Sequence, residues 1–416
     1  MKKHFILNNI MTIILLLLST NANAQTRYLD DLFEVKKADT AIVYAEVQSL
    51  KFPYLSEEKT EKQQLFMDVY QPKGDIKTNR PCILVIHGGS FLYGHRGEKN
   101  IIRIAEDMAK KGYVTVTIDY RLGFNSLNRE ASARAVYRSV QDTKAAIRFL
   151  KGNYQVFGID TTHIFAFGAS AGSIAAMHAA YLEESECCTI PATLDDLGCL
   201  SCSGNTLKHT DEPCAIANLW GAVIDTNIIN SEKNIPIISF HGTKDNIVSP
   251  DSVSPFNIST FPALSGTNLI TPRLKHLGIK TEYYKFNKGH APWLTAEKEP
   301  IYNTILNKTT LFFYDYLQKN PLNSIDELTY KSIKSDFQIY PNPTTEFINI
   351  DLSNYYTDIT IQITNSLGEI VRDIDIPKET QKETITFNLR DLPKGYYYLS
   401  INDNNQNQSQ LFCKSE

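Results

Sequence analysis

The sequence predicts an α/β fold with a doubly wound, mostly parallel sheet, followed by a small all-β sandwich-like domain. Between residues 64 and 318, strand-like and helix-like segments alternate, which is typical of a parallel sheet covered by helices on both faces. From residue 336 onward, short alternating segments are separated by Asn, Asp, Gly and Pro, as in small β domains. A length of 416 residues exceeds the usual size of a single core and agrees with two domains.

Runs of apolar or β-branched residues predict the strands of the first domain, which we place at 25–318. The runs at 82–86 and 113–118 are continuous and predict strands buried on both faces, whereas 65–70 alternates as an edge strand does. Further strands are expected at 164–167, 215–223, 235–240 and 281–286. Helices are expected at 100–111, 133–150, 268–277 and 301–317, and a glycine follows closely after each of the first three.

The polar residues 319–335 are expected to be a linker to the second domain, 336–416. In that domain the alternation predicts five strands, at 337–340, 347–352, 359–364, 384–389 and 396–401. This segment contains no histidine, so it is a poor candidate for nucleophilic catalysis.

The N-terminus indicates export. Lys2 and Lys3 precede an apolar run at 10–18 and an Ala-x-Ala ending at Ala24, which predicts a signal peptide over 1–24. The run is too short for a permanent membrane anchor, and no other segment predicts stable membrane insertion. A net charge of −4 gives no reason to expect a nucleic-acid partner.

Five of the seven cysteines lie between residues 187 and 214. In an exported protein this spacing predicts an insert stapled by disulfides, a loop or a cap. Cys199 and Cys202 also have the spacing of zinc ligands, an alternative that an oxidising compartment disfavours. Cys82 opens a predicted buried strand and is expected to be core filler.

Residues 168–172, Gly-Ala-Ser-Ala-Gly, directly follow the apolar run 163–167. This pattern is typical of a sharp strand-to-helix turn that exposes a nucleophilic serine, here Ser170, and the flanking glycines avoid clashes with neighbouring backbone. A serine nucleophile needs a base, an acid that orients the base, and donors for an oxyanion. In a parallel sheet all of these are expected at the carboxyl ends of strands.

The sequence offers each group after a predicted strand. Gly89 and Ser90 follow 82–86 and, with the amide of Ala171, are the expected oxyanion donors, although Gly88-Gly89 could be a plain turn. The expected acid is Asp245, with Asp251 as its rival.

The expected base is His290, which follows the strand at 281–286 and comes last in the order serine, acid, histidine. His95, His209 and His241 are less well placed alternatives, and His87 is expected to be structural.

Seven phrases together resemble the carboxylesterase-like branch of the α/β-hydrolase family. They are residues 67–72, 87–91, 117–123, 142–148, 168–172, 241–245 and 289–290, in the order of the family, and the resemblance covers most of 50–318. It implies a serine ester hydrolase with no metal or organic cofactor. Secreted relatives of this kind often remove acetyl or feruloyl groups from plant polysaccharides.

Two features depart from the family pattern: Ser90 stands where related lipases carry glycine, and the cysteine-rich stretch leaves the acyl pocket undefined. A serine peptidase of the same fold and a non-catalytic binding or adhesion protein remain the alternatives. The residues between 25 and 64 are too few for the propeller that such peptidases usually carry.

Residues 339–343, 363–371 and 392–397 resemble the C-terminal sorting domain of type IX secretion. This resemblance implies the type IX machinery as a partner, passage through the periplasm, and a secreted or cell-surface protein. A carbohydrate-binding module is the alternative for this domain.

Overall fold

The computed structural model describes residues 26–415, except for 190–193, 260, 295–297, 321–336, 353–356, 366–368, 381–383 and 403–406. The expected signal peptide, residues 1–24, lies outside the described residues. So does the expected linker, 319–335, apart from its first two residues.

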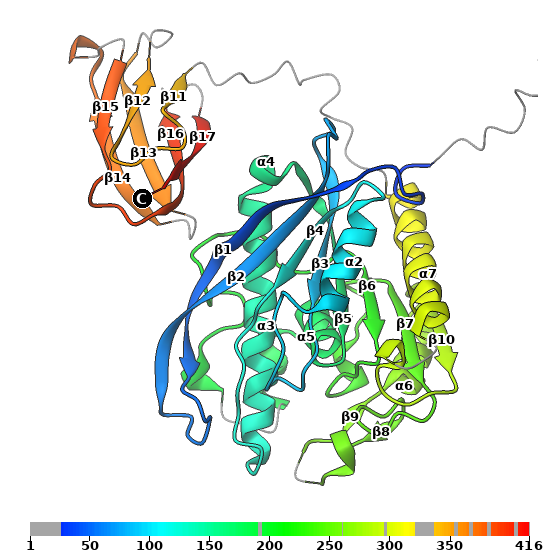
Figure 1. Cartoon of the computed structure of the whole chain (residues 1–416). Coiled ribbons are helices and arrows are strands. Elements are labelled where there is room, and N and C mark those ends of the chain that lie inside the picture. Colours follow the sequence, from blue (N-terminus) through cyan, green and yellow to red (C-terminus); the bar gives the residue numbers. More distant parts are fainter. Residues whose placement is uncertain are drawn as a thin grey trace, which may run out of the picture.

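An eight-stranded sheet forms the centre of the larger part of the chain (Figure 1). Its strands are β1 (Val35–Leu50), β2 (Thr60–Pro72), β3 (Arg80–Ile86), β4 (Val114–Ile118), β5 (Ile159–Ala169), β6 (Ile216–Leu219), β7 (Ile237–Gly242) and β10 (Thr281–Phe286). They lie in the order β1-β2-β4-β3-β5-β6-β7-β10. The six strands from β4 to β10 are parallel, and β1 and β2 pair antiparallel at one edge. The predicted fold class is confirmed.

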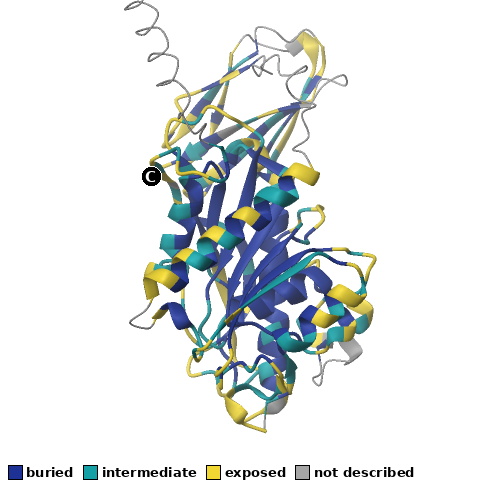
Figure 2. Cartoon of the chain, turned by 90° about the vertical axis from the view of Figure 1, so that its right-hand side faces the viewer, coloured by how far each residue is buried: buried dark blue, intermediate teal, exposed yellow. Residues whose placement is uncertain are grey.

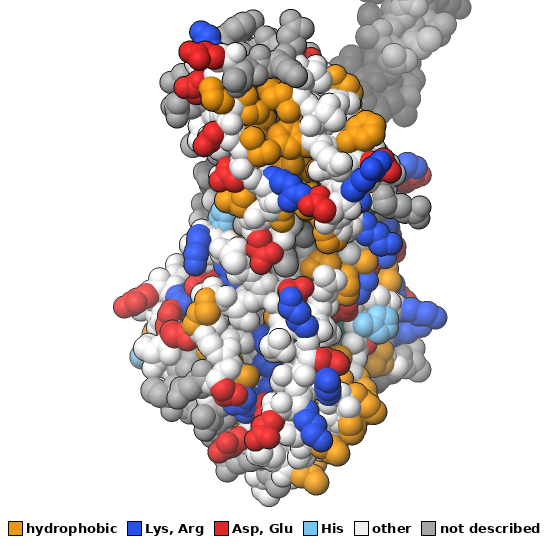
Figure 3. Space-filling view, turned by 90° about the vertical axis from the view of Figure 1, so that its left-hand side faces the viewer, with side chains coloured by type: hydrophobic (Ala, Val, Ile, Leu, Met, Phe, Trp, Pro, Cys, Tyr) orange, Lys and Arg blue, Asp and Glu red, His pale blue; other side chains and the backbone are white. Residues whose placement is uncertain are grey.

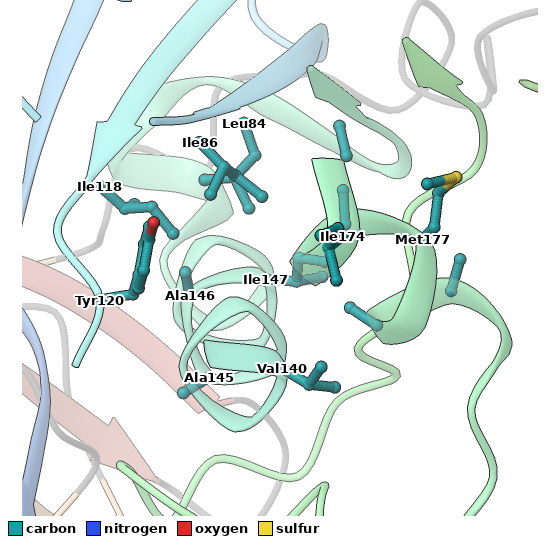
Figure 4. Packing of buried hydrophobic residues seen from close by; sticks show 14 of the residues in the cluster. Leu84, Ile86, Ile118, Tyr120, Val140, Ala145, Ala146, Ile147, Ile174 and Met177 are labelled. Atoms are coloured by element: carbon teal, nitrogen blue, oxygen red, sulfur yellow. The ribbon is translucent and has the colours of Figure 1, made fainter. Parts of the chain in front are cut away.

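Helices cover both faces of this sheet. The helices are α2 (Lys99–Ala109), α3 (Arg129–Gly152), the short α4 (Tyr154–Phe157), α5 (Ala171–Tyr181), α6 (Thr267–His276) and α7 (Lys298–Lys319). Side chains of β3 alternate between two buried clusters: Leu84 and Ile86 pack with α3 and α5 (Figure 4), while Ile83 and Val85 pack with α2 and α7. The strands in the middle of the sheet are coloured as buried in Figure 2. Burial on both faces explains why the sequence of β3 is a continuous apolar run.

Strand β1 was not predicted, because its sequence does not alternate. Its pairing with β2 has register shifts between Lys37 and Asp39, between Asp39 and Ile42, and between Val43 and Ala45. Each shift moves the following side chains to the opposite face, so the two-residue period is lost along the strand.

The cysteine-rich stretch braces helix α3. Cys199 and Cys202 form a disulfide, which corrects the zinc alternative for this pair, and Cys82 and Cys214 are free thiols. The side chains of Cys187 and Cys188 lie outside the described residues.

Buried charges hold this stretch in place. Asp211 pairs with both Lys144 and Arg148 of α3 at 2.8 Å. The Asn205 amide donates at 3.0 Å to the carbonyls of Tyr44 in β1 and Ala145 in α3. The stretch therefore packs against the side of α3 and the edge strand.

The C-terminal strands form two sheets that share one apolar cluster. One sheet contains β11 (Gln338–Tyr340), β12 (Phe347–Asp351) and β15 (Thr384–Asn388), and the other contains β14 (Ile370–Ile376), β13 (Ile359–Asn365), β16 (Gly395–Asn402) and β17 (Asn407–Lys414). The five predicted strands are present, and β14 and β17 were not predicted. Both lie at the edges of their sheet and carry many polar side chains, so their apolar alternation is weak.

Acidic and basic side chains are interspersed over the face shown in Figure 3. In the part of the chain that the structure describes, no helix combines the length and the apolar character that crossing a bilayer requires.

Buried charge on α3 also joins the helix to the end of β4. Asp142 is fully buried and accepts hydrogen bonds from the backbone N–H of Arg121 at 2.7 Å and from its guanidinium Nε at 2.9 Å. The Arg121 side chain donates further to the carbonyl of Arg138 at 3.2 Å. We predict that Asp142→Asn lowers the free energy of unfolding by about 3–5 kcal/mol, because it leaves a buried guanidinium without its counter-charge.

Urea unfolding followed by tryptophan fluorescence measures this loss, because the chain has two tryptophans, Trp220 and Trp293, and both lie in the α/β part. The matched control is Glu34→Gln, which breaks the exposed pair of Glu34 with Lys73 and should shift the midpoint little. Equal unfolding midpoints for the two variants would show that the buried pair of Asp142 with Arg121 stabilises the fold no more than the exposed pair does.

Candidate active site

The carboxyl ends of four parallel strands bring the candidate residues to one edge of the sheet. The turn 87–91 follows β3, Ser170 follows β5, Asp245 follows β7 and His290 follows β10. Parallel strands end at the same edge, so residues up to 203 positions apart in the sequence become neighbours.

Ser170 lies on a strained corner between β5 and α5. Its φ and ψ are 54° and −119°, a region that side-chain-bearing residues rarely adopt, and its N–H donates to the carbonyl of Leu219 at 2.8 Å. A Cβ on Gly172 would lie 2.3 Å from the carbonyl oxygen of Ile86, and one on Gly168 would lie 2.5 Å from that of Gly172. Only glycine fits at both positions, as the sequence pattern predicts.

Ser170, His290 and Asp245 form a continuous hydrogen-bonded chain. His290 Nδ1 lies 2.7 Å from Asp245 Oδ2, and His290 Nε2 lies 3.0 Å from Ser170 Oγ. Because a carboxylate only accepts, Nδ1 carries the proton and donates to Asp245. Nε2 is then left to accept the proton of the serine hydroxyl.

Asp245 is held as a carboxylate. Its Oδ1 accepts from the backbone N–H groups of Ile247 at 2.9 Å and Val248 at 3.0 Å, and its side chain is buried. Burial alone would raise the pKa of Asp245, but hydrogen bonds from His241 and His290, the charge of His290 and the bond from the Ile247 amide hold this pKa well below its usual range.

His241, an alternative base in the sequence, lies beneath Asp245. Its Nδ1 lies 2.8 Å from Thr267 Oγ1, and its Nε2 lies 2.8 Å from the carbonyl of Val248 and 3.3 Å from Asp245 Oδ2. Both ring nitrogens are therefore occupied within the core, and the residue supports the acid rather than facing Ser170. No sequence pattern predicts this supporting position.

The remaining alternatives lie outside the hydrogen-bonded chain. The rival acid Asp251 is exposed and accepts from Asn268 Nδ2 at 2.8 Å. His95 accepts from the amide of Gly97 at 3.1 Å in an exposed loop, and His209 is exposed as well.

The turn after β3 lies against Ser170. A Cβ on Gly88 would lie 3.2 Å from Ser170 Cβ, and one on Gly89, whose φ is 111°, would lie 2.0 Å from the carbonyl oxygen of Tyr93. Ala171 is the first residue of α5, where N–H groups lack a partner within the helix. In the part of the chain that the structure describes, the N–H groups of Gly89, Ser90 and Ala171 donate to no protein acceptor.

His87 supports this turn. Its ring stacks on Tyr120 with the centroids 4.3 Å apart, and its Nδ1 lies 2.7 Å from the carbonyl of Gly88. Burial lowers the pKa of His87 to about 4, so the ring is neutral at neutral pH.

The loop that carries His290 is fixed to the end of β7. Lys288 accepts from the backbone N–H of Lys244 at 2.9 Å, and a Cβ on Gly242 would lie 2.2 Å from the carbonyl oxygen of Gly289. The rings of Trp220 and His290 form a T-shaped pair with the centroids 6.3 Å apart. The position of the imidazole is therefore fixed both by the backbone of its loop and by the contact of its ring with Trp220.

A cavity of about 320 Å³ opens beside Ser170. Most of its lining is apolar: Phe91, Leu92, Phe124, Ala133, Val136, Ala171, Ile174, Ile224, Ile247, Val248, Pro255, Phe256, Phe261, Pro262 and Leu264. Apart from Ala171 and Phe91, which belong to the motifs of the predicted site, these residues carry no sequence signal that distinguishes them from other apolar residues. None of the described residues of the stretch 187–214 lines the cavity, so of the two alternatives, a stapled loop or a cap, these residues fit the loop.

Among the described residues, no group of three His, Cys, Asp or Glu side chains is placed to hold a metal ion.

Two family models match the chain. Residues 67–200 match BD-FAE, and residues 338–414 match the secretion system C-terminal sorting domain. These matches confirm the resemblance to α/β-hydrolase esterases and to type IX sorting domains that the sequence motifs indicated.

Curated relatives are similar over the same region. Gut esterase 1 of Caenorhabditis briggsae is 34% identical over 110 residues, which are 26% of this chain and 19% of the relative. Para-nitrobenzyl esterase of Bacillus subtilis is 33% identical over 118 residues, 27% of this chain and 24% of the relative. The chain thus spans about a fifth of the length of the curated relatives that it matches.

A solved structure of Thermogutta terrifontis esterase 2, phosphorylated by paraoxon, aligns with a TM-score of 0.48 and 19% identity. The alignment covers 72% of this chain and 98% of that one.

The lowered pKa of Asp245 predicts a pH-dependent contribution to stability. The pKa of Asp245 in the folded state lies below the value of about 3.9 in the unfolded chain, so the ionised carboxylate stabilises the fold. This contribution to the free energy of unfolding is fully present above about pH 3.9, and it is lost as the pH falls through the folded-state pKa. The difference in unfolding free energy between the wild type and Asp245→Asn should shrink as the pH falls below about 4. Urea unfolding followed by tryptophan fluorescence at several pH values measures it. A difference that grows below about pH 4 would contradict the assigned ionisation.

Proposed function

We propose that this protein, similar to α/β-hydrolase esterases, is a serine carboxylic ester hydrolase that acts through an acyl-enzyme. The observation that carries the proposal is the chain of contacts from Ser170 Oγ through His290 to Asp245, at 3.0 and 2.7 Å, beside an open cavity. A serine hydroxyl that donates to a neutral, oriented imidazole is the arrangement that activates it as a nucleophile.

In the first half of the reaction, Ser170 Oγ attacks the ester carbonyl carbon while its proton passes to His290 Nε2. The imidazolium that forms is stabilised by the carboxylate of Asp245. The carbonyl oxygen gains negative charge, and the N–H groups of Gly89, Ser90 and Ala171, which donate to no acceptor among the described residues, are the donors that would hold it. Collapse of the tetrahedral intermediate breaks the bond to the alcohol oxygen, which leaves with the proton from His290.

In the second half of the reaction, a water molecule attacks the acyl-enzyme by the same series of steps. His290 takes one proton from the water, the hydroxide adds to the acyl carbon, and the bond to Ser170 Oγ breaks as His290 returns the proton to the serine. The products are one carboxylic acid and one alcohol, and the enzyme is regenerated. No group beyond the protein and water takes part in these steps.

Export is the expected setting for this activity. The match of residues 338–414 to the secretion system C-terminal sorting domain supports a secreted or cell-surface location, reached through the periplasm and the type IX machinery. The expected signal peptide over residues 1–24 is part of this proposal, as are the domain boundaries at 25–318 and 336–416. Acetyl or feruloyl esters of polysaccharides are the substrates that the sequence resemblance implies.

The first test concerns the nucleophile. Ser170→Ala should lower kcat on p-nitrophenyl esters by at least about 10⁴-fold, because the remaining groups cannot form the acyl-enzyme. The matched control is Ser409→Ala on the exposed face of β17, which should leave kcat unchanged. Undiminished hydrolysis by Ser170→Ala would refute the proposal. Cleavage of aminoacyl amides with no hydrolysis of esters would instead favour a peptidase.

The second test compares the two carboxylates. Asp245→Asn should lower kcat by roughly 10⁴-fold, because an amide at this position favours the wrong tautomer of His290. Asp251→Asn removes an exposed carboxylate that accepts a hydrogen bond from Asn268, away from Ser170 and His290, and it should change kcat by no more than a few-fold. Equal losses in the two variants would overturn the assignment of the acid.

A further inference from the structure

The cavity beside Ser170 follows helix α5 away from the nucleophile. Ala171, Ile174 and His178 all line it, and they lie on the first two turns of the helix that begins directly after Ser170. A rise of 1.5 Å per residue puts His178 about 12 Å along the axis from Ser170. The first turns of α3 form the facing wall with Ala133 and Val136.

Aromatic side chains close the cavity on another side. The rings of Phe261 and Phe124 form a T-shaped pair with their centroids 6.1 Å apart. The ring of Phe261 also contacts that of Phe256, with the centroids 6.3 Å apart. Phe256 and Tyr93 are 41% and 73% exposed, so the cavity opens to solvent beside them. An acyl group on Ser170 can therefore lie in the cavity while the alcohol part of the ester remains outside.

Among the described residues, the side chains at the far end of the cavity offer no free partner for a polar substituent. His178 is buried, its Nδ1 lies 2.8 Å from the carbonyl of Ile174, and its Nε2 accepts from the amide of Ile224 at 3.1 Å. Burial lowers the pKa of His178 to about 4, so its ring is neutral. Among the described residues that line the cavity, none is Asp, Glu, Lys or Arg.

The remaining polar lining groups lie elsewhere. Ser90 belongs to the turn 87–91, beside Ser170, and Tyr93 lies at the exposed mouth of the cavity. Ser132 lies on the first turn of α3 and already makes an interaction. A hydroxyl group carried to the far end by an acyl group would lose water without gaining a partner there.

We propose that this cavity binds the acyl part of the ester and selects an unsubstituted apolar acyl group of medium length over acetyl. The inference rests on the proposed ester hydrolysis. A volume of about 320 Å³ is roughly ten times the ~30 Å³ that one water molecule takes up in the liquid, whereas acetyl has only three non-hydrogen atoms. The proposed acyl group differs from the acetyl or feruloyl groups that the sequence resemblance implies. Acetyl would leave most of the cavity unfilled, and feruloyl carries polar substituents.

The decisive experiment measures kcat/KM of the full chain on p-nitrophenyl acetate, butyrate, hexanoate and octanoate. Each methylene that enters the cavity should raise kcat/KM about threefold to fourfold until the cavity is filled. Hexanoate should therefore exceed acetate by at least about 50-fold. Highest activity on acetate, with hydrolysis still lost in Ser170→Ala, would overturn this inference and leave the proposed function intact. Absence of hydrolysis at every length would overturn both.

A second comparison tests the far end of the cavity. Methyl cinnamate and methyl 4-hydroxycinnamate differ by one hydroxyl, and the cinnamate should have a kcat/KM about fivefold higher or more, because the buried hydroxyl stays unpaired. A preference for the hydroxylated ester would overturn the inference in favour of hydroxycinnamoyl substrates.

A variant locates the selectivity in the cavity. Val136→Phe fills space facing α5 and should lower the ratio of hexanoate to acetate kcat/KM at least tenfold. The matched control is Leu311→Phe, an exposed position on α7 at the opposite face of the sheet, which should leave this ratio unchanged. An unchanged ratio in a folded Val136→Phe would overturn the assignment. If that variant does not fold, the wild-type series decides.

Discussion

The close approach of the β5–α5 corner to the end of β3 is the constraint on which the site depends. A Cβ at Gly172 would meet the carbonyl oxygen of Ile86 at 2.3 Å, so α5 can start this near to β3 only with glycine at that position. This approach puts Ser170 beside Gly88 and sets the first amide of α5 beside the turn that carries Gly89. The strained backbone of Ser170 is retained because strand and helix packing fix both sides of the corner.

The orientation of the His290 imidazole is set by the carboxylate of Asp245. Asp245 receives two backbone N–H groups on Oδ1 and the imidazole on Oδ2, so its orientation is fixed independently of His290. A pre-oriented carboxylate defines which imidazole nitrogen carries the proton, and therefore which nitrogen faces Ser170. His241 adds a buried donor beneath the carboxylate, and its ring is itself held by Thr267. In the proposed reaction, these side chains would need little reorganisation when charge develops on the imidazole.

Sequence patterns predicted the parts of this molecule that short-range chemistry dictates. Continuous apolar runs identified the buried parallel strands, and strand ends then placed Ser170, Asp245 and His290 at one edge. The bulges of β1 hide its alternation, and polar edge strands such as β17 carry little apolar signal. The cavity was not predictable, because its walls come from loops and helix turns that meet only through long-range packing.

Helix α3 presents different faces to different partners. Ala133 and Val136 line the cavity, whereas Asp142 is buried against Arg121. Contacts with the cysteine-rich stretch run along the helix from Arg134, which pairs with Asp196 at 2.6 Å, to Arg148, which pairs with Asp211 at 2.8 Å. A buried ion pair that loses one partner destabilises a fold strongly, while a side chain facing an open cavity tolerates changes in size more easily. Substitutions at Ala133 and Val136 can therefore alter the shape of the cavity while the neighbouring charged side chains keep the helix in place.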